Sequence, residues 1–208
     1  VTVTNPTPGG GASNSIDIEI TPLAPTISNV TPTTVGPGER ITVTGTNFGP
    51  GSLILLRGLP ISTTADSTTQ LTGTIPSSAQ TGSADVIVRN PAVQGQAAQD
   101  SSAMTIQIVN PVPAISSLNP TSGVPGTGIT VSGTGFIPAS QILLNGNAVG
   151  SSFGDATTMT FTIPLNAVIG SASVQVSNPG PGGGSSNTQA LNVIAPTPQV
   201  YAVSPSSG

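Results

Sequence analysis

The chain has 208 residues, of which only 5% are charged: three arginines stand against seven acidic residues, the net charge is −4, and lysine, histidine and cysteine are absent. A chain with no basic cluster cannot displace counterions from nucleic acid, and one without cysteine forms neither disulfides nor zinc–thiolate centres. Without histidine or lysine there is no base to activate its many serines as nucleophiles, so we do not expect this chain to be an enzyme.

The first 24 residues resemble the C-terminal part of a module whose complete form follows. Val1–Pro6 matches Val86–Pro91, and Ile16–Ile20 alternates apolar and acidic residues, as a strand with one buried face does. Asp17 and Glu19 lie on the polar face of that strand and are the only paired carboxylates to weigh as calcium ligands. A solvated strand face is the simpler interpretation.

Residues 25–112 make one complete repeat. Short apolar segments with a period of two, separated by glycine and proline turns, predict about seven strands and no helix. This pattern is typical of an all-β, immunoglobulin-like sandwich. The apolar positions expected to face its core include Ile41, Val43, the Leu53–Leu56 run, Leu71, Ile75, Ala84, Val86, Val88, Met104, Ile106 and Ile108.

Residues 113–197 repeat this unit with an offset of 88 positions, and residues 198–208 begin another. Asn145-Gly146 predicts a tight hairpin. Phe153 and Phe161 stand where the first repeat has Ala65 and Gly73, so we expect a larger second core. Proline braces the links Asn110–Pro113 and Ile194–Pro198. We therefore expect tandem sandwiches in a rod-like array.

In the first repeat, four motifs follow one another: Pro-x-Ile-x-x-Val-x-Pro at Pro25–Pro32, Gly-Pro-Gly at Gly36–Gly38, Ile-Thr-Val-Thr-Gly-Thr-Asn-Phe-Gly at Ile41–Gly49, and Ile75-Pro76. In this order they resemble the IPT/TIG domains, including those of bacterial surface proteins. The second repeat departs at Gly135-Phe136-Ile137, where the asparagine and the glycine after phenylalanine are missing. The resemblance implies an early-set immunoglobulin-like sandwich in each complete repeat and carries no catalytic residues with it.

Candidate sites are few, and we expect no catalytic, cofactor-binding or metal-binding residue. Asn29-Val30-Thr31 matches the sequon for glycosylation, which makes Asn29 a possible glycan carrier. The glycine-rich segments Pro8–Gly11 and Pro181–Gly184 lack the helix and lysine of a phosphate-binding loop, so we interpret them as hairpin loops. Tyr201, the only tyrosine, is expected to pack at a junction between modules.

Two functions remain open. The first is a non-catalytic structural component of an extracellular filament, stalk or sheath, whose partners are other copies of the chain or neighbouring repeats. Threonine-rich edges without lysine favour such association. The alternative is an adhesin, or carbohydrate-binding or spacer modules of a larger cell-surface protein or secreted enzyme, with glycans or the cell surface as partner. Both predict an extracellular location, and no apolar run approaches the length of a membrane span.

Overall fold

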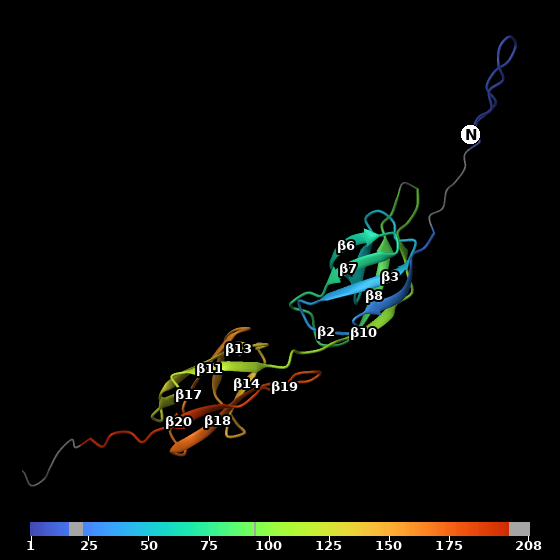
Figure 1. Cartoon of the computed structure of the whole chain (residues 1–208). Coiled ribbons are helices and arrows are strands. Elements are labelled where there is room, and N and C mark those ends of the chain that lie inside the picture. Colours follow the sequence, from blue (N-terminus) through green and yellow to red (C-terminus); the bar gives the residue numbers. More distant parts are fainter. Residues whose placement is uncertain (17–22, 94, 200–208) are drawn as a thin grey trace, which may run out of the picture. The chain divides into compact units, whose positions relative to one another are not determined.

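The computed structural model describes residues 1–16, 23–93 and 95–199, and strand is the only regular secondary structure in these ranges (Figure 1). Two β-sandwiches follow one another along the chain. The first runs from β1 (Thr26–Thr31) to β10 (Met104–Ile108), and the second from β11 (Ala114–Asn119) to β20 (Gln189–Val193). The all-β, tandem immunoglobulin-like architecture expected from the repeats is confirmed. The segment Ile16–Ile20, with Asp17 and Glu19, lies mostly outside the described residues.

In the first sandwich, a four-stranded sheet faces a six-stranded one. The four-stranded sheet has the order β1, β3 (Arg40–Thr46), β7 (Gln70–Thr74) and β6 (Ser62–Ser67). The six-stranded sheet has the order β2 (Thr34–Val35), β10, β8 (Gly82–Asn90), β4 (Leu53–Leu56) and β5 (Leu59–Pro60), with β9 (Gln99–Asp100) paired to β8. The strands beyond the expected seven are two-residue segments, too short to leave a periodic signal in the sequence.

The second sandwich repeats this topology. Its four-stranded sheet has the order β11, β13 (Gly128–Thr134), β17 (Thr158–Thr162) and β16 (Ser151–Asp155). Its six-stranded sheet has the order β12 (Ser122–Gly123), β20, β18 (Gly170–Asn178), β14 (Gln141–Leu144) and β15 (Asn147–Val149), with β19 (Gly184–Ser185) paired to β18.

Alternating strand residues build the core of each sandwich, as the period of two predicts. In the first, Ile41, Val43, Leu71, Val86 and Val88 are fully buried, whereas the threonines between them face outward. The last strand, β10, buries Ile106 and Ile108, but Met104 is only half-buried at its start. Burial of this alternating set holds the two sheets together, because each aliphatic side chain removed from water contributes roughly 1.5–3 kcal/mol.

The two cores differ at one position of the four-stranded sheet, where the first sandwich has Gly73 and the second has Phe161. Phe161 of β17 is buried opposite Ile129, and the equivalent pair in the first sandwich is Gly73 and Ile41. A Cβ at Gly73 would lie 2.9 Å from the Cδ1 atoms of both Ile54 and Ile61. Since the second sandwich also has an isoleucine, Ile142, at the position of Ile54, Ile61 is the side chain that takes the space of the missing ring. Its counterpart in the second sandwich, Val149, is smaller and only partly buried. The other expected core addition, Phe153, lies at the sheet edge with 36% of its surface exposed.

The hairpins β4–β5 and β14–β15 turn through the same backbone conformation. Asn145 and Gly146 have φ of 51° and 80°, which confirms the predicted Asn-Gly turn. The first sandwich uses Arg57 and Gly58 at φ of 50° and 80°. Sequence reasoning missed that turn because arginine rarely adopts a positive φ.

In each sandwich, the chain enters at one end and leaves at the opposite end. In the second sandwich, the start of β18 (Gly170) pairs with the end of β20 (Val193), where the chain leaves. At the far end of β18, Asn178 lies beside the segment through which the chain enters. We call these ends the C-terminal pole and the N-terminal pole of a sandwich.

Candidate functional site

The N-terminal pole of the second sandwich holds a buried cluster of polar groups around Asn178, which is only 3% exposed. Its Nδ2 donates to the carbonyl oxygens of Pro111 (2.8 Å) and Gly135 (2.7 Å), and its Oδ1 accepts from the hydroxyl of Ser140. The Ser140 hydroxyl in turn accepts from the amide of Ile137 at 2.8 Å. One asparagine thus connects the incoming segment to the β13–β14 loop.

The first sandwich has a related but more exposed cluster around Asn90. Its Nδ2 donates to the carbonyl of Asn47 at 2.8 Å, and its Oδ1 accepts from the hydroxyl of Ser52 at 2.6 Å. Asn47 then donates through its own Nδ2 to the carbonyl of Ala24, at 3.1 Å, in the incoming segment. The Asn-Pro at the end of β8 and of β18 therefore holds the preceding chain in both sandwiches, once directly and once through a second asparagine.

The glycine-rich loop after β18 binds the linker residue Asn110. Asn110 donates from its amide to the carbonyl of Pro181 and from Nδ2 to the carbonyl of Pro179, both at 2.8 Å. Its own carbonyl accepts from the amide of Gly183 at 2.9 Å. At Gly182, with φ of 70°, a Cβ would lie 2.7 Å from that carbonyl oxygen, so the linker passes where only glycine leaves room. The Pro181–Gly184 segment is therefore a backbone clamp for the linker.

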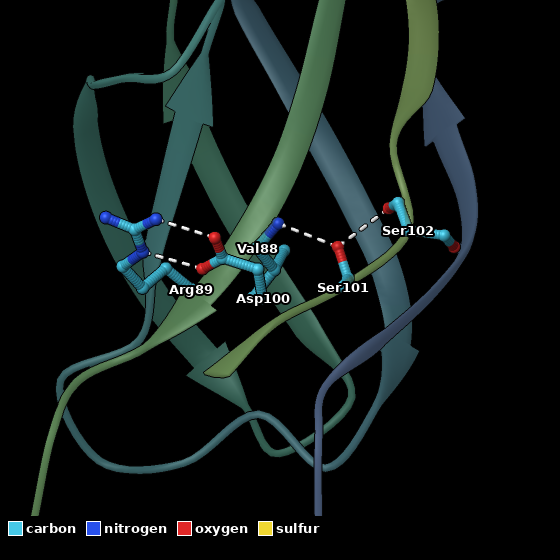
Figure 2. A network of polar contacts seen from close by, with 5 residues as sticks. All are labelled: Val88, Arg89, Asp100, Ser101 and Ser102. Atoms are coloured by element: carbon cyan, nitrogen blue, oxygen red, sulfur yellow. Dashed lines mark hydrogen bonds and ion pairs between the residues drawn. The ribbon is translucent and has the colours of Figure 1, made fainter. Parts of the chain in front are cut away.

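A buried serine bonds a backbone amide of the central strand, β8 or β18, in each six-stranded sheet. Figure 2 shows Ser101, whose hydroxyl accepts from the amide of Val88 at 3.0 Å and donates to the carbonyl of Ser102 at 2.8 Å. Ser186 does the same in the second sandwich, accepting from Val176 and donating to Asn187. Both hydroxyls thus satisfy backbone groups of their own sandwich.

Beside Ser101, an exposed ion pair joins β8 to β9 (Figure 2). Arg89 donates from Nε and Nη2 to the two carboxylate oxygens of Asp100, each at 2.6 Å. This hydrogen bonding lowers the pKa of Asp100 and raises the pKa of Arg89. The serines Ser177 and Ser185 take these two positions in the second sandwich, so the ion pair is a local support for the first sandwich only.

The other carboxylates that the structure describes accept from nearby hydroxyls or amides. Asp66 accepts from Thr72 at 2.7 Å, and Asp85 accepts from Thr105 at 2.9 Å. Asp155 accepts from the hydroxyl and the amide of Thr157, and these bonds lower its pKa. Within the described ranges, no three acidic, histidine or cysteine side chains converge as metal ligands would.

Among the candidate site residues expected from the sequence, Asn29 lies within the described ranges. Asn29 is exposed on β1, and its Nδ2 donates to the hydroxyl of Thr31, the third residue of the sequon, at 2.8 Å. Glycosylation at Asn29 stays a prediction. Asp17, Glu19 and Tyr201 lie outside the described residues.

A feature that sequence reasoning missed lies at the C-terminal pole of the second sandwich. The loop Pro164–Ile169 exposes Leu165, Val168 and Ile169 at 85%, 78% and 50%. A cavity of about 460 Å³ opens beside the loop, between it and the β14–β15 hairpin. The signal was present in the sequence, because the first repeat carries Ser77, Gln80 and Thr81 at the matching positions.

The sequence model of the IPT/TIG domain matches residues 25–106 and 113–192. A search by sequence among curated proteins gave no match. In the part of the chain that the structure describes, no helix is long and apolar enough to cross a membrane.

Three solved structures illustrate the similarity of fold. The Bacteroides ovatus protein SGBP-B of a mixed-linkage glucan utilization locus, in complex with a heptasaccharide, is 19% identical with a TM-score of 0.34; 89% of this chain and 48% of that one are covered. The surface glycan-binding protein PbSGBP-B of Prevotella bryantii is 14% identical with a TM-score of 0.48, at 81% and 41% coverage. Murine CEACAM1b is 14% identical with a TM-score of 0.32, and the match covers 82% of this chain and 100% of that one. This chain spans less than half the length of the two glycan-binding proteins, and at these scores the likeness carries no conclusion about ligands.

Proposed function

Because the chain belongs to the IPT/TIG domain family, we propose that its two modules are non-catalytic structural units that space and connect the parts of a larger extracellular protein. A long stalk, filament or sheath and the spacer region of a cell-surface protein are two forms of this function. Both need modules that pass the chain from one end to the other and hold it there.

The observation that carries the proposal is the binding of the incoming chain at the N-terminal pole. Asn178 holds the Pro111 carbonyl, and the loop after β18 binds both the amide and the carbonyl of Asn110. The Asn178–Pro111 bond is partly buried, so breaking it leaves a partly desolvated polar group at a cost of up to about 1–3 kcal/mol. Such a linker transmits tension directly into β18, the central strand of its sheet.

The surface chemistry supports an extracellular setting. Hydroxyl and amide side chains replace most surface charges, with 5% charged residues against roughly 25% in an average protein. Lysine on edge strands commonly prevents the edges of two sheets from pairing, and this chain has no lysine. Such a surface suits modules that lie against one another or against a cell surface.

Glycan binding is the second candidate, and one feature of the second sandwich favours it. A shallow hollow of about 590 Å³ lies along β13, β16 and β17 and is lined mainly by hydroxyl-bearing residues, among them Thr130, Ser152, Thr160 and Thr162. Thr130, Thr160 and Ser152 are paired across three neighbouring strands, and their hydroxyls can donate and accept hydrogen bonds with the hydroxyls of a sugar chain.

Two measurements decide between the candidates. Atomic-force unfolding of the chain, pulled from its ends, is expected to give two force peaks, and Asn178→Ala is expected to lower one of them. A glycan array probed with the labelled chain is expected to stay blank. Binding that is lost in Thr130→Ala/Thr160→Ala, together with force peaks that do not respond to Asn178→Ala, would establish glycan recognition and overturn the structural proposal.

A further inference from the structure

We propose that Leu165, Val168 and Ile169 form a docking surface for the module that begins at Pro198. We call these three side chains the C-terminal patch. The inference rests on the proposed function in one respect, that modules follow one another in an array. It adds to that function a specific surface and a specific partner.

The apolar character of the patch is not needed to fold the loop. In both sandwiches the loop begins with the same turn, in which Ala167 donates to the Pro164 carbonyl at 3.0 Å and Ala79 donates to the Pro76 carbonyl at 2.9 Å. The first sandwich builds this turn with Ser77, Gln80 and Thr81 at the three matching positions. Leu165, Val168 and Ile169 therefore serve something outside their own sandwich, since exposed apolar clusters mark contact surfaces.

The position of the patch indicates what covers it. Val193, the end of the last strand, pairs with Gly170, the residue directly after the patch. The chain then leaves through Ile194, which is 43% exposed and extends the same apolar surface. Only the proline-rich link Ile194–Pro198 precedes the next repeat, and five residues span at most about 17 Å. A module that begins at Pro198 would therefore start within about 17 Å of this pole.

The size of the patch favours a tethered partner over a free one. Its exposed fractions amount to about two fully exposed aliphatic side chains, or roughly 200–300 Å² of apolar surface. Two copies of the chain meeting through this patch would bury on the order of 500 Å², well below the roughly 1,200 Å² of a stable interface between free proteins. A module on a short link experiences an effective concentration in the millimolar range, at which so small a contact is sufficient.

Pulsed electron spin resonance on the native protein, through the repeat that starts at Pro198, tests the proposal. Since this chain has no cysteine, Ser152→Cys and Ser206→Cys place one spin label on the second sandwich and one on the next module. We expect a single narrow distance distribution. In L165S/V168Q/I169T, which copies the polar loop of the first sandwich, we expect its width to increase at least twofold. The variant L165M/V168I/I169V keeps the surface apolar and should keep the distribution narrow.

Three outcomes would overturn the proposal: a broad distribution in the parent protein, a width that the polar variant leaves unchanged, or a concentration-dependent dimer in sedimentation that the polar variant abolishes. The last would assign the patch to a second copy of the chain. The melting temperature of the second sandwich should stay the same in both variants, because the first sandwich folds with the polar loop. A glycan-array signal would contradict the structural function and leave the docking result intact, so the two failures are distinguishable.

Discussion

Replacing Asn178 by alanine should destabilise the second sandwich more than any other single truncation at its N-terminal pole. The side chain is 3% exposed and donates to the carbonyls of Pro111 and Gly135 while it accepts from Ser140. Truncation leaves two carbonyls and one hydroxyl without these partners. Each unsatisfied buried group costs about 1–3 kcal/mol, and partial entry of water lowers the sum. We expect a loss of about 2–4 kcal/mol in the free energy of unfolding.

A loss of this size is a large part of the stability of such a domain. At roughly 0.05–0.15 kcal/mol per residue, a sandwich of this length has a free energy of unfolding of about 4–12 kcal/mol. For domains of this size, each kcal/mol shifts the melting temperature by about 4–8 °C, so Asn178→Ala should lower the melting temperature of the second sandwich by roughly 8–32 °C. Differential scanning calorimetry of the whole chain should show this shift in one transition only.

The first sandwich supplies the matched control. Asn90 occupies the equivalent position but is half-buried, so water replaces part of what Asn90→Ala removes. For Asn90→Ala we expect about half the loss in free energy of unfolding, seen in the thermal transition of the first sandwich. Asn178→Asp should be worse than alanine, because a carboxylate places negative charge against the carbonyls of Pro111 and Gly135. A shift below about 3 °C for Asn178→Ala, or one no larger than that of Asn90→Ala, would refute the reasoning.

Three further predictions concern the core, the buried serines and the ion pair. Gly73→Phe should lower the free energy of unfolding by about 1–3 kcal/mol, because the new ring collides with Ile61. In the double variant Gly73→Phe/Ile61→Val, urea titration should show that part of this loss is recovered. If the effects of the two substitutions simply add, Ile61 does not occupy the space of the ring. Ser186→Ala should cost about 1–3 kcal/mol and raise the hydrogen-exchange rate of the Val176 amide, and unchanged exchange would count against its bridging role. The lowered pKa of Asp100 means that its contribution to stability is present above the ordinary aspartate value of about 3.9 and is lost as the pH falls through the lower folded value. Carbon-detected NMR titration should find that midpoint below the ordinary value and shifted upward in Arg89→Gln; a midpoint insensitive to Arg89 would contradict the assignment.

Much of the fold could be predicted from the sequence, since strand alternation is a local property. Ile41 and Val43 are buried because successive side chains in a strand point to opposite faces. The Asn145-Gly146 turn could be predicted equally well, because asparagine and glycine tolerate a positive φ. The same turn at Arg57-Gly58 was not, because arginine takes that conformation only where the surrounding hairpin holds it there.

The candidate sites were harder to predict, because they depend on contacts between distant residues. The role of Asn178 follows from Pro111, 67 positions earlier, and that of Gly182 from Asn110. The sequence of the glycine-rich loop predicts a hairpin loop. Its binding of the linker could not be predicted, because the sequence does not show that Asn110 lies beside it. The C-terminal patch was visible as a difference between the repeats, but its exposure and its place at the pole were not.

The sequence by itself determined the repeat, the period of two and the family motifs, and hence a tandem β-sandwich. These are properties of single residues and of short spacings. The tertiary structure decided which asparagine holds the chain, which isoleucine fills the space of a missing ring, and which apolar residues remain uncovered. Burial and hydrogen-bond geometry arise only when segments far apart in the sequence are packed together, and no local pattern encodes them.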